Sequence, residues 1–392
     1  MREARQVPGE VSALFWVDGG PGHRVLRRLG LAPLDDHAFA VAAGAAAIAW
    51  LPLLVLASTE GVLTGGVRLP FLHDLGAHVR CLFAVPVLLL AELPIGAWLD
   101  RCTAQFLAAD LVRSEDRPVF AGLLVAAQRS RDSRAAATVV LAAAYLTTVA
   151  VVFLGVGPEG TWKAPSPGHA LGRAGQWYAL VSLPLFHFLL YRWIHRLFVW
   201  GGFLRRVARL DLRLTATHPD RAGGLGFLGD GLLPLGFLVF AASAAVSGTI
   251  ATRILFEGAT LELYHSSYLA LLVLTLLIVI GPLFAVAPAL VRLKSRSLFE
   301  HGALGCRYTQ RFEEKWVAGE RPSDESLLGT ADVQSLADLA ASHQVVGALR
   351  LVPLGRRGAL GLVILGVLPA LPLVATTKAV RGFLQQALMV FL

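Results

Sequence analysis

Long apolar runs, each of about twenty residues, dominate the pattern of this chain. Six runs contain few charges, and a seventh is interrupted only by Pro369 and Pro372. A helix needs about 20 mainly apolar residues to cross the roughly 30 Å of bilayer hydrocarbon. The pattern therefore predicts an all-α, polytopic transmembrane helical bundle of about seven passes. The predicted passes are residues 39–57, 80–99, 136–156, 177–200, 227–252, 267–291 and 358–377.

The polar segments between these runs divide the chain into four parts. We expect residues 1–38 to form a cytoplasmic N-terminal segment and residues 39–291 to form a six-pass bundle with a cytoplasmic amphipathic stretch at 100–134. Residues 292–357 are expected to form a cytoplasmic helical segment, and residues 358–392 the last pass and an interfacial tail.

Helical spacing of apolar residues also appears outside the predicted passes. The segment 100–134 between passes two and three has the spacing of an amphipathic helix. After pass six, apolar or aromatic residues recur every fourth position from Leu304 to Trp316, which predicts that this pass continues as a helix. A second helix is expected near 330–349, so that 292–357 would form a small helical layer.

Composition and charge distribution fit a chain that is solvated mostly by lipid. The chain is 55% hydrophobic and 16% charged, whereas soluble proteins carry about 25% charged residues. Of the 35 Lys and Arg residues, 28 fall on alternate segments that would share one side of the membrane. Cytoplasmic segments carry the excess of basic residues, so the N-terminus is expected to be cytoplasmic. The net charge of +8 then needs no nucleic-acid partner.

The linker from Thr215 to Gly231 is rich in glycine and carries four candidate loop residues. These are His218, Asp220, Arg221 and Asp230. Three glycines formally match a dinucleotide fingerprint, but that motif must follow a strand, and here it runs into a predicted pass. A structured turn with Asp220 as a cap is expected instead. The alternative is anion binding by exposed backbone N–H groups together with Arg221.

Three motifs resemble a signature of uncharacterised bacterial multi-pass inner-membrane proteins. They are the run from Arg209 to Leu228, with its THPDRAGGLGFL sequence, the run from Leu328 to Leu339, and the segment at Arg131-Asp-Ser. The resemblance implies a bacterial membrane protein, and it assigns no activity and no site residues. An arginine-rich, lysine-poor composition also suits a bacterial source.

Glu92 and His187 lie where lipid is expected. A charge at bilayer depth costs about 2.5–3.5 kcal/mol on insertion scales, so such residues are functional candidates. Glu92 is about 18 Å from Arg80 along pass two, and His187 is about 15 Å from Trp177 along pass four. The two passes run in the same direction, so we expect Glu92 and His187 at similar depth and in contact. Tyr191 and Arg192 follow as further candidates.

Together these features favour an ion channel or small-solute transporter, expected to be homo-oligomeric, with its Glu/His site near the permeation path. The alternative is a signalling or scaffolding protein that acts through its cytoplasmic helices. We predict no enzymatic activity and no cofactor. The cysteines lack paired spacing and His187, His195 and His265 differ in depth, so neither a metal site nor a haem is expected.

Overall fold

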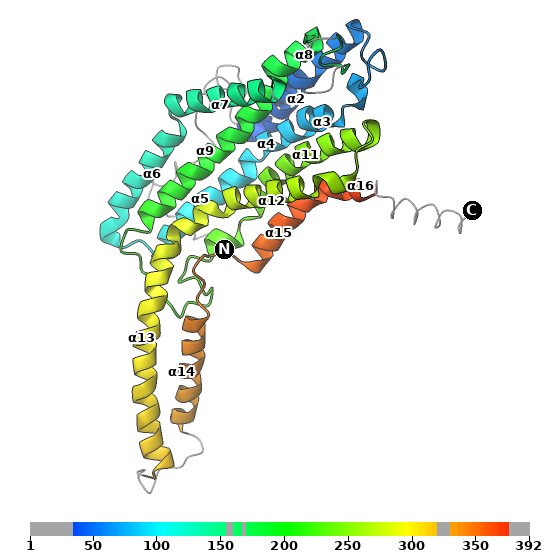
Figure 1. Ribbon diagram of the computed structural model, residues 1–392. Helices are drawn as coiled ribbons and strands as arrows, with labels where there is room; N and C mark the ends of the chain where they lie inside the picture. Colours follow the sequence, from blue (N-terminus) through cyan, green and yellow to red (C-terminus); the bar gives the residue numbers. More distant parts are fainter. Residues whose placement is uncertain (1–33, 154–159, 167–169, 320–329, 376–392) are drawn as a thin grey trace, which may run out of the picture.

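In a computed structural model, the chain is a bundle of helices from which one helical hairpin projects (Figure 1). The structure describes residues 34–153, 160–166, 170–319 and 330–375. The predicted N-terminal segment lies outside these residues up to position 33, and so does the tail from position 376. Within the described ranges there are helices and turns but no strand, which confirms the all-α class.

Six helices of the described part are long and apolar enough to cross a membrane. They correspond to six of the predicted passes. The chain is thus a multi-pass helical membrane protein. The six helices are His37–Thr59, Leu75–Ala108, Arg134–Val152, Phe227–Phe256, Leu261–Val317 and Arg356–Val374.

The remaining predicted pass, 177–200, is helical but is not among these six, because polar residues interrupt its apolar sequence. It belongs to a continuous helix of three parts, α8 (Arg173–Trp177), a π-helical segment η4 (Tyr178–Ser182) and α9 (Leu183–Val207). In Figure 1, α9 runs through the bundle beside α4, α6 and α7.

Helix Leu75–Ala108 also has internal breaks. It starts as α3 (Leu75–His78), passes through a π-helical segment η2 (Val79–Ala84) and α4 (Val85–Leu90), and continues as α5 (Glu92–Ala108). A proline removes a backbone donor, and Pro86 and Pro94 both lie near these breaks.

The other helices of the bundle are regular over most of their length. They are α2 (Leu34–Thr59), α6 (Arg117–Arg131), α7 (Arg134–Phe153), α10 (Phe227–Asp230), α11 (Gly236–Phe256), α12 (His265–Ile280), α15 (Arg356–Val367) and α16 (Leu371–Val374). Small residues of α11 are buried and face α3 and η2, with Gly248 against Leu75 and Val79, so that stripe packs the bundle.

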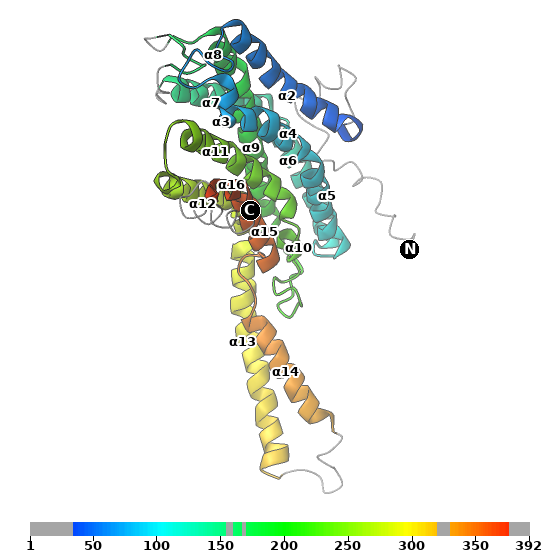
Figure 2. The same ribbon diagram turned by 90° about the vertical axis from the view of Figure 1, so that its right-hand side faces the viewer.

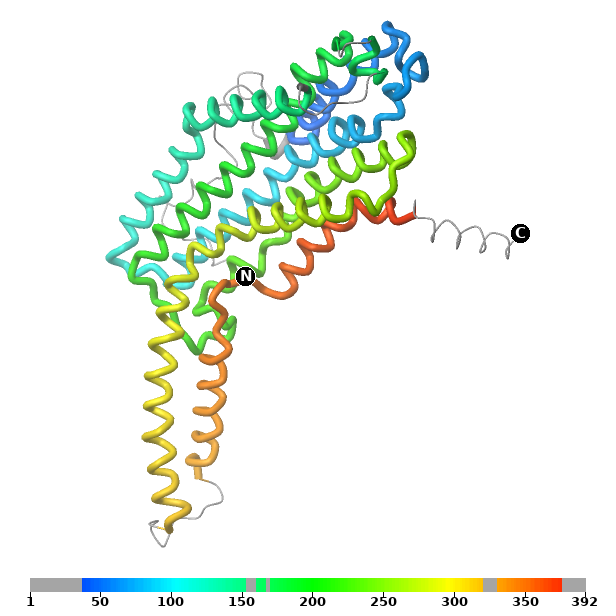
Figure 3. The backbone as a smooth tube through the Cα atoms, in the orientation of Figure 1, coloured from blue at the N-terminus to red at the C-terminus, as the bar shows by residue number. Residues whose placement is uncertain are grey.

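The projecting hairpin consists of α13 (Ala287–Phe312) and α14 (Ala331–Gly347). The backbone tube bends where the 3-10 turn η7 (Gly281–Val286) joins α12 to α13 (Figure 3). The hairpin stands clear of the bundle in the perpendicular view as well (Figure 2). Both helices of the predicted cytoplasmic layer are thereby confirmed. We call the end from which they project the hairpin end.

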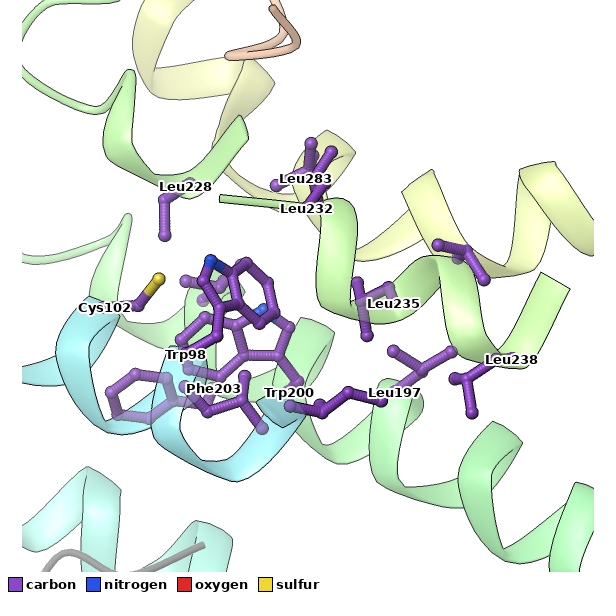
Figure 4. Packing of buried hydrophobic residues seen from close by; sticks show 14 of the residues in the cluster. Trp98, Cys102, Leu197, Trp200, Phe203, Leu228, Leu232, Leu235, Leu238 and Leu283 are labelled. Atoms are coloured by element: carbon purple, nitrogen blue, oxygen red, sulfur yellow. The ribbon is translucent and has the colours of Figure 1, made fainter. Parts of the chain in front are cut away.

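Aromatic and leucine side chains form the core at the hairpin end. Trp98 of α5 packs edge-on against Trp200 of α9, with ring centroids 6.1 Å apart. Leu228 and Leu232 close over the two indole rings, and Leu283 of η7 lies behind them (Figure 4). This core fixes α5 and α9 against each other, and these two helices carry most of the candidate site.

Candidate functional site

Two arginines of α9 converge on the single carboxylate of Glu92. Arg192 forms an ion pair with Oε1, and Arg196 Nη1 lies 3.4 Å from Oε2. The Glu92 side chain is only 6% exposed. The two arginines are four residues apart, so they lie on the same face of α9 and can reach one acceptor. The Nε atom of Arg192 is buried without a hydrogen-bond partner among the described residues.

A second ion pair extends this charged cluster toward the hairpin end. Arg131 at the end of α6 donates to both carboxylate oxygens of Asp132, at 2.7 and 2.9 Å, and its side chain is 4% exposed. Its charge is close enough to act on Arg196. Arg196 also lies over the ring of Trp193, 5.0 Å from its centroid. The cluster thus holds three guanidinium groups and two carboxylates.

His187 and Tyr191 face α7 rather than Glu92. The Nδ1 atom of His187 lies 3.1 Å from the hydroxyl of Thr148, and the Tyr191 hydroxyl is 2.8 Å from that of Thr147. The His187 and Tyr191 rings are stacked at 5.9 Å. The contact expected between Glu92 and His187 is not among the described interactions of either side chain. His187 points from the face of α9 that packs on α7, whereas Arg192 and Arg196 point from the face that meets Glu92.

Polar side chains follow one another along α9 and its neighbours, and we call them the polar series: Arg80 and Tyr178, then His187 and Tyr191, then Arg192 and Arg196. Arg80 and Tyr178 form its end away from the hairpin. They pair with each other from η2 and η4, and Arg80 also donates to Thr249 at 3.3 Å. Both residues lie in π-helical segments, which occur frequently at functional sites. From Tyr178 to Arg196 the polar series extends about 27 Å along the helix axis, which is close to the thickness of bilayer hydrocarbon.

At the end opposite the hairpin, Asp74 is buried and both of its carboxylate oxygens have polar partners. Its carboxylate lies 2.7 Å from Lys163 Nζ and accepts hydrogen bonds from Trp162 Nε1 at 3.0 Å and from the Ala77 amide at 3.0 Å. Burial raises the pKa of the Asp74 carboxyl, but Lys163 and these donors outweigh burial and hold the pKa well below its ordinary value. The cluster therefore holds the connecting segment 160–166 against α3.

The glycine-rich linker is a structured turn built on Asp220. Its carboxylate accepts the backbone N–H groups of Ala222, Gly224 and Gly226 at 2.8, 3.2 and 2.8 Å. Burial raises the pKa of this carboxyl, but the backbone donors outweigh it and hold the pKa below 3.8. Gly223 and Gly224 have φ of 66° and 96°, which favours glycine. The N–H groups of this turn are thus occupied by a protein carboxylate, which argues against anion binding by them.

Arg350 ties this turn to the segment before α15. It donates to the carbonyl oxygens of Asp220 at 2.6 Å and Leu354 at 2.8 Å, and its amide donates to the Arg221 carbonyl at 2.8 Å. Among the loop candidates, Arg221 therefore contributes its backbone to the scaffold.

The other three loop candidates line one cavity of about 690 Å³ at the hairpin end. His218, Asp220 and Asp230 form one wall, and Arg213 and Arg101 lie beside them. The indole nitrogen of Trp98, which also lines the cavity, is buried and has no hydrogen-bond partner in the described part of the chain.

Sequence reasoning placed Glu92, Arg192, His187 and Tyr191 in the site but missed three contributors. The three are Arg196, Arg131 and Arg80; from the sequence, Arg131 served only in a family motif and Arg80 only as a depth reference for Glu92. The spacing of Arg192 and Arg196 within a largely apolar segment was the available signal. Groups of three or more His, Cys, Asp or Glu side chains that could hold a metal ion do not occur in the described ranges.

Comparison with protein-family models, curated proteins and solved structures finds no match to this chain.

Proposed function

We propose that this protein is an ion channel or small-solute transporter and that the permeating species is an anion. The observation that carries the proposal is the excess of buried positive charge around Glu92, where Arg192 and Arg196 share one carboxylate. A charge inside the bilayer is costly unless it serves a partner or a permeating ion. A permeating anion would meet two guanidinium groups that share the charge of one carboxylate, so positive charge remains to bind it.

The polar series along α9 supports a path through the bundle. It begins with Arg80 and Tyr178, continues past His187 and Tyr191, and reaches Arg192 and Arg196. The cavity at the hairpin end, with Arg101 and Arg213 on its wall, would serve as the vestibule at that end. Basic side chains at a vestibule raise the local concentration of anions.

Charge distribution also supports an orientation. The hairpin end carries the loops with most of the basic residues, so we place it, and the N-terminus, in the cytoplasm. The resemblance to uncharacterised bacterial inner-membrane proteins supports that location. We propose a homo-oligomer, as many channels are, and no enzymatic activity.

Anion flux into proteoliposomes tests the transport proposal. The wild-type protein should carry Cl⁻ or another small anion down its gradient, and Arg192→Gln and Arg196→Gln should each lower the flux by at least tenfold. Removing one charge-assisted bond that the permeating ion uses costs about 1.5–3 kcal/mol, which is roughly a tenfold to hundredfold change in occupancy. Arg307→Gln, an exposed change on α13, is the matched control and should leave flux unchanged.

Cation flux in the same vesicles tests whether the permeating ion is negatively or positively charged. Selective K⁺ or Na⁺ flux that survives both arginine variants would contradict the anion proposal. Silence of folded wild-type protein under every gradient would contradict transport itself and favour the second candidate function.

That second candidate is a scaffold or signalling protein, and the projecting hairpin favours it. α13 and α14 stand clear of the bundle, and Phe299 and Val317 are 79% and 68% exposed. If the hairpin lies outside the membrane, these apolar side chains are available to a partner protein. A Phe299→Ser variant that loses a co-purifying protein while ion flux stays unchanged would support this function over transport.

A further inference from the structure

A second cavity, of about 590 Å³, lies between α9 and the break that separates α12 from α13. All of its lining residues except one are apolar or glycine. The exception is Arg205, near the end of α9. The walls are formed by Ile194, Leu197, Phe198, Gly201 and Gly202 of α9 and by Leu277, Ile278, Gly281, Pro282 and Ala285.

Glycine and proline create this groove. At Gly201, a Cβ atom would lie 3.4 Å from the Cα of Pro282, so the two backbones approach closely there. At Gly202 and Gly281, a Cβ atom would meet no heavy atom within 4 Å. The absence of side chains at these two positions therefore leaves open volume along the groove.

The groove follows the axis of α9, with its basic end toward the hairpin. α9 and α12 both run toward the hairpin end, so Ile194 and Leu277 lie deep and Arg205 lies at the mouth. From Ile194 to Arg205 the helix rises about 16 Å, which is roughly the length of one acyl chain within one leaflet. On its rim, Phe198 is 76% and Leu277 60% exposed, so none of the described residues covers this rim.

Arg205 brings a charge to this apolar groove that no acidic side chain of the described residues neutralises. The ion pairs of the described residues do not include it. Arg206 and Arg209 follow within little more than one turn. A guanidinium group binds phosphate through two parallel hydrogen bonds.

We propose that this groove binds an anionic phospholipid, with one acyl chain along the α9 wall and the phosphate at Arg205. Basic pockets between transmembrane helices on the cytoplasmic side commonly bind anionic headgroups. A second copy of the chain is a weaker occupant, because a symmetric contact would bring its own basic α9 end against the same patch. The proposal is independent of whether the protein conducts ions.

Lipid binding to the full-length protein in detergent tests this proposal. The protein is titrated with phosphatidylglycerol or with zwitterionic phosphatidylcholine, and native mass spectrometry counts the lipids that each chain retains. Wild type should retain phosphatidylglycerol in preference to phosphatidylcholine. Arg205→Gln should weaken phosphatidylglycerol binding by about fivefold, the contribution of one basic side chain near an anionic headgroup.

Two filling variants test the groove itself. In Gly202→Leu and Gly281→Leu the added Cβ atom meets no heavy atom within 4 Å. A melting curve checks that each variant folds, and each folded variant should lose the retained lipid. Arg206→Gln controls for a general loss of basic charge at the same helix end. Gly44→Leu, on the open face of α2, controls for added bulk on the membrane surface and should retain lipid as wild type does.

Three results would overturn the proposal. The first is equal retention of the two lipids by wild type, and the second is unchanged phosphatidylglycerol retention in Arg205→Gln and in both filling variants. The third is dissociation of an oligomer by Gly202→Leu or Gly281→Leu with lipid retention unchanged, which would assign the groove to a second copy of the chain.

Discussion

The Glu92 carboxylate lies near the midpoint of the Leu75–Ala108 helix, where water does not solvate it. Two guanidinium groups share it, so either arginine can be replaced and the carboxylate still keeps one counter-charge. Loss of the carboxylate leaves two buried cations without their acceptor, which costs about 3–5 kcal/mol when a buried pair is broken. We therefore expect Glu92→Gln to unfold more readily than Arg192→Gln, and flux through the arginine variants is the cleaner test of function.

Asp220 carries a pH-dependent part of the stability of the linker turn. Its folded-state pKa lies below 3.8, so its contribution is complete above the ordinary pKa and is lost as the pH falls through the folded value. Replacement by Asn removes the charge but keeps one acceptor. We expect Asp220→Asn to cost about 2 kcal/mol of stability at pH 7 and the same at about pH 5.

Melting temperatures of wild type and Asp220→Asn, measured in one detergent across pH, test this. The difference between them should shrink below about pH 4, because protons then bind the carboxyl of the unfolded chain more readily than that of the folded protein. Adding His218→Gln to both proteins removes the imidazole whose Nδ1 lies 2.8 Å from this carboxylate. With that change made, a difference that already changes between about pH 7 and pH 5 would contradict the assignment to this carboxyl.

At the scale of elements, helical periodicity was enough to predict where helices lie. It located six membrane helices and both helices of the hairpin. It could not predict how a helix faces its neighbours. His187 and Arg192 are five residues apart, which turns them about 140° from each other around α9. One therefore faces Thr148 of α7 and the other Glu92, and depth in the membrane alone could not distinguish them.

The pattern of apolar residues could not predict the local breaks within the helices either. The π-helical segments η2 and η4 keep the apolar composition of their flanks, and only their hydrogen bonding differs. They bring Arg80 and Tyr178 together. A residue pair that depends on such a break can be found only once the packing of the two helices is known.

The hairpin depends on contacts of Asp332 at the start of α14. Its carboxylate accepts hydrogen bonds from Lys315 Nζ and Trp316 Nε1, both at 2.9 Å, and its carbonyl accepts one from the Tyr308 hydroxyl at 3.0 Å. Lys315 and Trp316 lie in the π-helical segment η8 (Glu313–Val317) that continues α13, so Asp332→Ala should loosen α14 from that end of the hairpin. Hydrogen–deuterium exchange should become severalfold faster across Ala331–Gly347, with exchange in α9 unchanged.

Asp338→Ala is the matched control for this change. Its carboxylate accepts only from Gln334 within the same helix, at 2.8 Å among the contacts described. Faster exchange in both variants would attribute the effect to helix propensity rather than to the contact between the two helices.

At the scale of the whole molecule, the charge distribution along the chain and the shape of the bundle agree. The loops that carry most of the basic residues gather at the end from which the hairpin projects, and α13 extends beyond the bundle at that end (Figure 1). Sequence patterns predict the six membrane helices that the described part of the chain contains. They do not predict the shape of the hairpin-end cavity, because residues from α5 and from the linker 213–231 line it together.

Native cysteines allow this topology to be tested without engineered labels. Cys306 on α13 is exposed, whereas Cys81 and Cys102 are buried inside the bundle. A membrane-impermeant maleimide should therefore add one label per chain in inside-out vesicles and none in right-side-out vesicles. Cys306→Ser should abolish the label, and denaturation should expose the two buried thiols to the reagent. Labelling of Cys306 in sealed right-side-out vesicles would place the hairpin outside the cell and reverse the proposed orientation, so that the basic loops would violate the positive-inside rule.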